Sequence, residues 1–205
     1  MERLVGAAID IAFERRVEPA HAVAQQARAI AETCHAIAAR FHRGGKLVVF
    51  GNGGSSTDAE HIAVEFMHPV IVGKRALPAI CLTADVATLT GVAGETGLAE
   101  VFAHQVSLVA DPTDIALGVS ADGGCPGVLR GLEAAHELGM LTVALSGGDG
   151  GALSRSPAVD HVLVAPSDDP RVVKEIHVTI YHILWELVHV FLEQPGVLDT
   201  GLVVA

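Results

Sequence analysis

Residues 46–66 of this 205-residue chain combine a glycine-rich turn with polar side chains that suit an anion. The apolar run LVVF predicts a buried parallel strand, and it leads into Asn52, Gly53, Gly54 and Ser55. The glycines allow a tight turn and close approach of a ligand, and free N–H groups at the start of the next helix favour phosphate. The spacing fits neither a P-loop nor a dinucleotide fingerprint. We therefore interpret this turn as a phosphate cradle, with an ordinary tight turn as the alternative.

A histidine and a carboxylate follow on the same predicted helix. His61 and Glu65 are four residues apart, so they share one helix face about a turn below the cradle. A base beside an anion site predicts proton transfer on a phosphorylated substrate. Spacing alone also permits a solvated His–Glu pair, but the neighbouring glycine turn favours the functional interpretation.

The elements that would position these residues repeat a strand, a turn of small residues and a helix. This repeat predicts an α/β fold with three αβα layers, in which helices cover a doubly wound five-stranded parallel sheet. The predicted strands cover residues 47–50, 79–82, 114–119, 141–145 and 161–164. Ligands of such folds bind at the carboxyl ends of the strands, so the turns at Gly51, Ser120 and Ser146 are expected to gather there.

The N-terminal residues 1–44 are expected to form a helical arm on an α/β core over 45–205, the whole chain being one domain. Two Ala-rich helices are predicted between about Arg3 and Arg43, with a break near Pro19. Their apolar positions cover a broader stripe than one domain face needs. An arm that packs on another subunit accounts for this stripe, and simple surface helices are the alternative.

Composition excludes several classes of partner. The formal net charge of −11 opposes binding to nucleic acid or to an anionic membrane surface. The three cysteines are scattered without CxxC spacing, as is typical of a reducing compartment. The N-terminus carries charges among its apolar residues, unlike a signal peptide, and no apolar run approaches the length of a membrane span. A cytoplasmic protein without a nucleic-acid or membrane partner is expected.

Further ionisable residues lie on later predicted helices. The last helix, about residues 171–193, carries three histidines on a mainly apolar sequence, including His177 and His182. Two interpretations of these histidines are left open: they are buried core residues, or they form part of a ligand site. Lys174 adjoins its most polar face, and Glu95 lies beside a glycine-broken turn where a solvated carboxylate is the simpler interpretation.

Three motifs, GNGGSSTDAEHIAVEF, ALSGGDGG and KEIHVTIYHILWELVHVFLE, resemble the SIS (sugar isomerase) fold and, more narrowly, the phosphoheptose isomerase family. The resemblance covers nearly the whole chain. It implies a homotetramer that converts sedoheptulose 7-phosphate to glycero-manno-heptose 7-phosphate through an enediol, with Glu65 and His182 exchanging protons with the substrate. The substrate-binding residues that it implies are Asn52, Gly53, Gly54, Ser55, Glu95, Ser120, Asp122 and Lys174.

Some members of that family hold zinc, and the resemblance maps metal ligands onto His61, Glu65 and His182. Lys174 stands in place of a family glutamine, and an ammonium has no lone pair to offer a metal. Zinc binding is therefore left open. Three protein ligands plus water would make a catalytic set, and the alternative is that Lys174 replaces the charge of the metal.

The loop after the third predicted strand departs from the family pattern. The family's S-T-S-G-N-S is S-A-D-G-G-C at residues 120–125, and Asp122 adds a negative charge that repels phosphate. A family arginine is replaced at residues 67–69, for which Lys74 or Arg75 is expected to compensate. Two alternatives to the isomerase follow: a SIS-fold sugar-phosphate-binding or regulatory protein without efficient catalysis, and an isomerase of a differently phosphorylated or unphosphorylated sugar.

Overall fold

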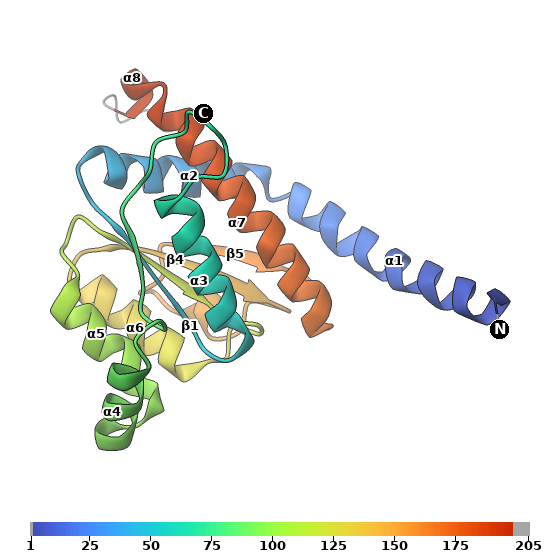
Figure 1. Cartoon of the computed structure of the whole chain (residues 1–205), viewed down its shortest axis with the longest axis horizontal. Helices are drawn as coiled ribbons and strands as arrows, with labels where there is room; N and C mark the ends of the chain where they lie inside the picture. Colours follow the sequence, from blue (N-terminus) through green and yellow to red (C-terminus); the bar gives the residue numbers. More distant parts are fainter. Residues whose placement is uncertain (1, 199–205) are drawn as a thin grey trace.

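The computed structural model describes residues 2–198 of the chain and centres on a parallel five-stranded sheet (Figure 1). The strands are β1 (Leu47–Gly51), β2 (Ala79–Cys81), β3 (Ile115–Val119), β4 (Leu141–Gly147) and β5 (His161–Ala165). Their order across the sheet is β2-β1-β3-β4-β5, and every pairing is parallel. The predicted doubly wound parallel sheet is confirmed, although β4 continues to Gly147 instead of ending at Leu145.

Eight α-helices accompany the sheet in the described part of the chain. They are α1 (Glu2–Ala24), α2 (Ala27–His42), α3 (Gly54–Met67), α4 (Val86–Thr96), α5 (Val101–Val109), α6 (Pro126–Glu137), α7 (Pro170–Leu192) and α8 (Pro195–Leu198). Short 3₁₀ turns lie at Leu98–Glu100 and Leu153–Arg155.

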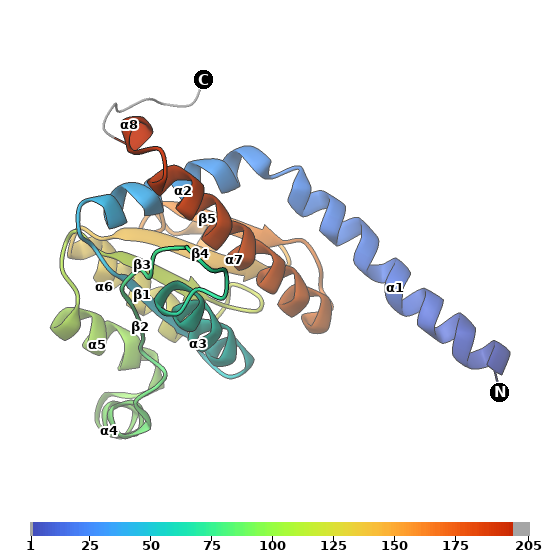
Figure 2. The same ribbon diagram turned by 45° about the horizontal axis from the view of Figure 1, so that its top comes forward.

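Two apolar clusters on opposite faces of the sheet produce the three layers. Alternate side chains of a strand point to opposite faces, so Leu47 and Val49 join one cluster while Val48 and Phe50 join the other. The first cluster includes α2, α3 and α7, and the second includes α5 and α6 (Figures 1 and 2). Because β1, β3 and β4 are buried along their whole length, their sequences are continuously apolar or small.

The N-terminal helix α1 projects beyond the body of the molecule (Figures 1 and 2). The predicted break near Pro19 is wrong, because α1 continues through this buried proline and ends at Ala24. The chain turns at Gln26 instead, where the side-chain amide donates to Val164 O at 2.7 Å and accepts from Val164 N at 3.3 Å. This amide pairs with the edge strand β5, so the sheet edge determines where the arm ends.

Two further features concern the predictions made from apolar runs and from cysteine spacing. Within residues 2–198, the helices are too short or too polar to cross a membrane. All three cysteines are free thiols, and burial raises the pKa of Cys34 to about 12.

Candidate active site

The turn between β1 and α3 begins the site. Gly51 packs so closely that a Cβ would lie 2.9 Å from Val119 O on the neighbouring strand and 2.8 Å from Ser55 O. Gly53 adopts φ +59, a conformation that favours glycine, and no side chain caps the helix that follows. Buried Ser55 therefore lies at an uncapped helix start, the local geometry that suits an anion.

A cavity of about 480 Å³ opens at this turn, and we call it the cradle cavity. Its walls come from the carboxyl ends of β1 and β3 and from the first turns of α3 and α7. The polar residues that line it are Asn52, Ser55, Asp58, Ser120, Asp122, Arg171, Lys174 and His177. The structure thus brings together most of the residues implied for substrate binding, with Gly54 in the same wall and exposed Gly53 beside it.

Asp122 occupies hydrogen-bond donors of the loop after β3. Its Oδ1 accepts from Gly124 N at 2.8 Å and from Ser120 Oγ at 3.3 Å. The loop turns at Gly123, whose φ is +68. A carboxylate of the chain itself therefore takes donors that a bound anion would otherwise use.

Lys174, like Asp122, forms its hydrogen bonds with groups of the chain itself. Its Nζ donates to Gly54 O at 2.9 Å, to Thr57 Oγ1 at 3.0 Å and to Asp58 Oδ1 at 2.7 Å. Asp58 is buried, so this ion pair joins the start of α7 to the first turns of α3. Three acceptors use all three ammonium protons, and Asp58 balances the charge.

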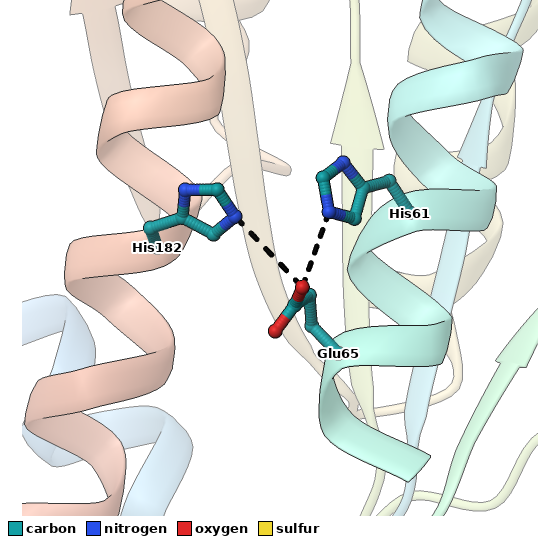
Figure 3. A group of neighbouring side chains, drawn as sticks. All are labelled: His61, Glu65 and His182. Atoms are coloured by element: carbon teal, nitrogen blue, oxygen red, sulfur yellow. Dashed lines mark hydrogen bonds and ion pairs between the residues drawn. The ribbon is translucent and has the colours of Figure 1, made fainter. Parts of the chain in front are cut away.

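A second group of side chains, His61, Glu65 and His182, lies further along the same seam between α3 and α7 (Figure 3). Glu65 Oε1 is 3.2 Å from His61 Nε2 and 4.0 Å from His182 Nε2. Figure 3 shows both imidazoles directed at this carboxylate. The three side chains, which we call the proton-transfer cluster, offer ligand atoms within 4.8 Å of one another. They line a separate cavity of about 410 Å³.

Two aromatic residues that the sequence analysis did not single out support the proton-transfer cluster. Tyr181 Oη is 2.7 Å from His61 Nδ1, and Trp185 Nε1 donates to Glu65 O at 2.9 Å. Their four-residue spacing on α7 places both on the face toward α3. That spacing was the available signal, but buried aromatic residues at helical spacing ordinarily indicate core packing.

Buried His177 was noted in the sequence without a role. It lines the cradle cavity, and its Nε2 has no hydrogen-bond partner among the described residues. Burial lowers the pKa of His177, which favours the neutral ring with an acceptor or donor available to a ligand.

Several residues expected near the ligand lie elsewhere. Lys74 pairs with Glu193 at 2.5 Å near the end of α7, and neither Lys74 nor Arg75 lines the cradle cavity, so the expected compensation is wrong. Arg171 is the arginine at this cavity, and it pairs with Asp169 at 2.7 Å. Glu95 is exposed on α4 and lines neither of the two cavities.

The parallel sheet with a cavity at its carboxyl edge is the arrangement of a doubly wound fold that binds a ligand. The SIS domain family matches residues 15–147, so this is a SIS-domain protein. Phosphoheptose isomerase from Desulfovibrio desulfuricans is 41% identical over 170 residues, which are 82% of this chain and 80% of that protein. The Aquifex aeolicus phosphoheptose isomerase is 37% identical over 79% of this chain and 84% of its own length. The chain belongs to the phosphoheptose isomerase family.

Solved structures agree with this assignment. A phosphoheptose isomerase from Francisella tularensis superimposes with a TM-score of 0.83 at 33% identity, covering 89% of this chain and 97% of that one. A phosphoheptose isomerase from Neisseria gonorrhoeae superimposes with a TM-score of 0.82 at 24% identity, which supports the fold alone.

Proposed function

We propose that this chain is an aldose–ketose isomerase that converts sedoheptulose 7-phosphate to glycero-manno-heptose 7-phosphate. The observation that carries the proposal is the carboxylate of Glu65 lying between His61 Nε2 and His182 Nε2, at 3.2 and 4.0 Å. A carboxylate so placed suits removal of a proton from carbon, and an imidazole beside it suits proton exchange with oxygen. Family membership supports the substrate.

In the proposed reaction Glu65 removes a proton from C1 of the ketose. The C–H electron pair becomes the C1=C2 bond of the enediol while O2 takes a proton from His182. Glu65, whose proton exchanges with solvent, then protonates C2, and His182 accepts the proton of O1 as the aldehyde forms. Incubation of the purified protein with sedoheptulose 7-phosphate should give NMR signals of the aldose. A folded protein that leaves the sugar unchanged would contradict the proposal.

The phosphate end of the substrate lies in the cradle cavity and its carbonyl end at the proton-transfer cluster. Both cavities border the same two helices: Ser55 and Lys174 line one, and Glu65 and His182 line the other. Roughly 15 Å of helix axis separates residues 55 and 65 at 1.5 Å per residue. This separation favours an extended, open-chain sugar phosphate, which is also the form that isomerisation requires.

The proton-transfer cluster also suits zinc. His61, Glu65 and His182 supply two imidazoles and a carboxylate, which are common zinc ligands and leave a position for substrate or water. Lys174 makes no fourth ligand, since its ammonium is held by Asp58 at the cradle cavity. A zinc ion bound there would polarise the substrate carbonyl.

Asp122→Ser is expected to lower KM for the sugar phosphate by about tenfold. A tenfold change in KM corresponds to about 1.4 kcal/mol of binding free energy. The substitution removes a charge that repels phosphate and frees the N–H of Gly124. Steady-state kinetics measures the change, and kcat should stay within a few-fold. Asp122→Asn is the matched control, because it removes the charge while an amide oxygen still accepts from Gly124. We expect an intermediate KM for it, and an unchanged KM in both variants would refute this role of Asp122.

The position of Asp122 also supports a second candidate, an isomerase whose substrate carries its phosphate elsewhere or lacks one. The Asp122 carboxylate suits a sugar hydroxyl that donates a hydrogen bond better than it suits an anion. Parallel assays with phosphorylated and unphosphorylated ketoses distinguish the two candidates. The second requires Asp122→Ser to lower kcat/KM for the preferred sugar.

We also propose that the chain forms a homotetramer through its N-terminal arm. Val5, Ile9 and Phe13 on α1 are 51%, 50% and 69% exposed, an apolar surface that water does not favour. Sedimentation equilibrium should give a mass four times that of the 21.2 kDa chain. Ile9→Glu with Phe13→Glu should dissociate the assembly, whereas exposed Glu14→Gln should leave it intact. A wild-type monomer would contradict the tetramer.

A further inference from the structure

Among residues 2–198, Tyr181 carries the one hydroxyl that contacts the proton-transfer cluster. Its Oη lies 2.7 Å from His61 Nδ1, and its side chain is 1% exposed. The ring also makes edge contacts with His61 and His182, at centroid distances of 5.2 and 4.9 Å. Tyr181 is therefore held by packing where its hydroxyl can act on the imidazole of His61.

The two nitrogens of His61 have different neighbours. Nε2 faces Glu65 Oε1 at 3.2 Å, and Nδ1 faces Tyr181 Oη. When Nε2 carries the proton and donates it to Glu65, Nδ1 is an acceptor and needs a donor. When Nε2 presents its lone pair to a metal or a proton, Nδ1 carries hydrogen and needs an acceptor.

A tyrosine hydroxyl serves both states, because it donates in the first and accepts in the second. A phenolic hydroxyl, whose ordinary pKa is about 10, carries its proton at neutral pH. A phenylalanine would keep the packing but leave His61 Nδ1 without its partner.

We propose that Tyr181 is a positioning residue, whose hydroxyl holds the ring of His61 with Nε2 toward Glu65 in both tautomers. This inference rests on the proposed role of the proton-transfer cluster. The hydroxyl of Tyr181 touches no reacting atom, and its one partner in the cluster is His61. An outer partner of this kind typically contributes about 10–100-fold to metal affinity or activity.

The first test is the side-chain ¹⁵N NMR spectrum of His61 in metal-free protein, which requires neither turnover nor zinc. In the wild type the Nδ1 signal should show a hydrogen-bonded nitrogen. In Tyr181→Phe it should move to the position of a nitrogen without a partner. Thr179→Val is the matched control, since it removes an exposed hydroxyl two residues away on α7 that bonds only Glu175 O. An Nδ1 signal that is the same in wild type and Tyr181→Phe would overturn the proposal.

The second test measures consequences for binding and turnover. Tyr181→Phe should weaken zinc binding, measured by competition with a chromophoric chelator, by about 10–100-fold, and lower kcat more than it raises KM. In a His61→Gln background the same substitution should have no further effect on either quantity. An equal effect in both backgrounds would show that the hydroxyl acts through packing and would overturn the proposal. A wild-type protein that binds no zinc would contradict only the proposal that the cluster holds zinc. The NMR comparison would still decide the role of Tyr181.

Discussion

Glu65→Gln is expected to lower kcat by about 10²–10⁴-fold, the contribution of a positioned general base. The amide keeps the shape of the side chain but has no basic oxygen to take a proton from carbon. The carbonyl oxygen of the amide can still accept from His61, so the contact between these residues on α3 is preserved. Steady-state kinetics with sedoheptulose 7-phosphate measures the loss, and thermal unfolding checks that the fold is unchanged.

Glu60→Gln provides the matched control for this prediction. Glu60 lies on the same helix as Glu65, but its side chain is exposed and lines neither the cradle cavity nor the cavity of the proton-transfer cluster. We expect its kcat to equal that of the wild type. Equal losses in both variants would mean that charge on α3 matters generally, and full activity in Glu65→Gln would remove Glu65 from the mechanism.

Gly123→Ala is expected to destabilise the protein by about 2–5 kcal/mol, from backbone strain together with overpacking. Gly123 has φ +68, and a Cβ there would overlap the backbone oxygen of Gly150. The loop after β3 therefore packs directly on the loop after β4, and this contact fixes the position of Asp122. Denaturant unfolding measures the change in free energy.

Gly139→Ala separates the two causes. Gly139 has φ +87, so alanine there is strained as well, but its Cβ would meet only Pro112 at an ordinary 3.7 Å. Conformational strain alone predicts a loss of about 1–2 kcal/mol. A loss in Gly123→Ala no larger than in Gly139→Ala would disprove the close packing of the two loops.

The fold was predictable because its signals are local. Each buried strand reads as a short apolar run, and each is followed by small residues and a helical pattern, so a parallel sheet was the consistent solution. The end of α1 was not predictable from Pro19, since it depends on a contact between Gln26 and Val164, which are 138 residues apart. Long-range pairing of this kind leaves no periodic pattern in the sequence.

The candidate site was predictable in part. The four-residue spacing of His61 and Glu65 indicated a shared face, and the resemblance to the family joined His182 to them. The structure places His182 Nε2 on α7 4.0 Å from the same carboxylate. The partners of the charged residues were not predictable. Lys174 is paired with Asp58 across two helices, and Asp122 turns back on its own loop, because each outcome depends on tertiary geometry. The same is true of Tyr181, whose hydroxyl has a partner only once α3 and α7 are packed together.

The most direct test of the central claim is solvent exchange during turnover. Protein would be incubated with sedoheptulose 7-phosphate in D₂O, and ¹H NMR would follow the protons on the carbon beside the carbonyl. Enediol chemistry with Glu65 as the base predicts that deuterium enters C2 of the aldose and, through the reverse reaction, C1 of the ketose, because the proton held by Glu65 exchanges with solvent. This exchange should be lost in Glu65→Gln. Exchange that persists in Glu65→Gln would contradict the proposed mechanism.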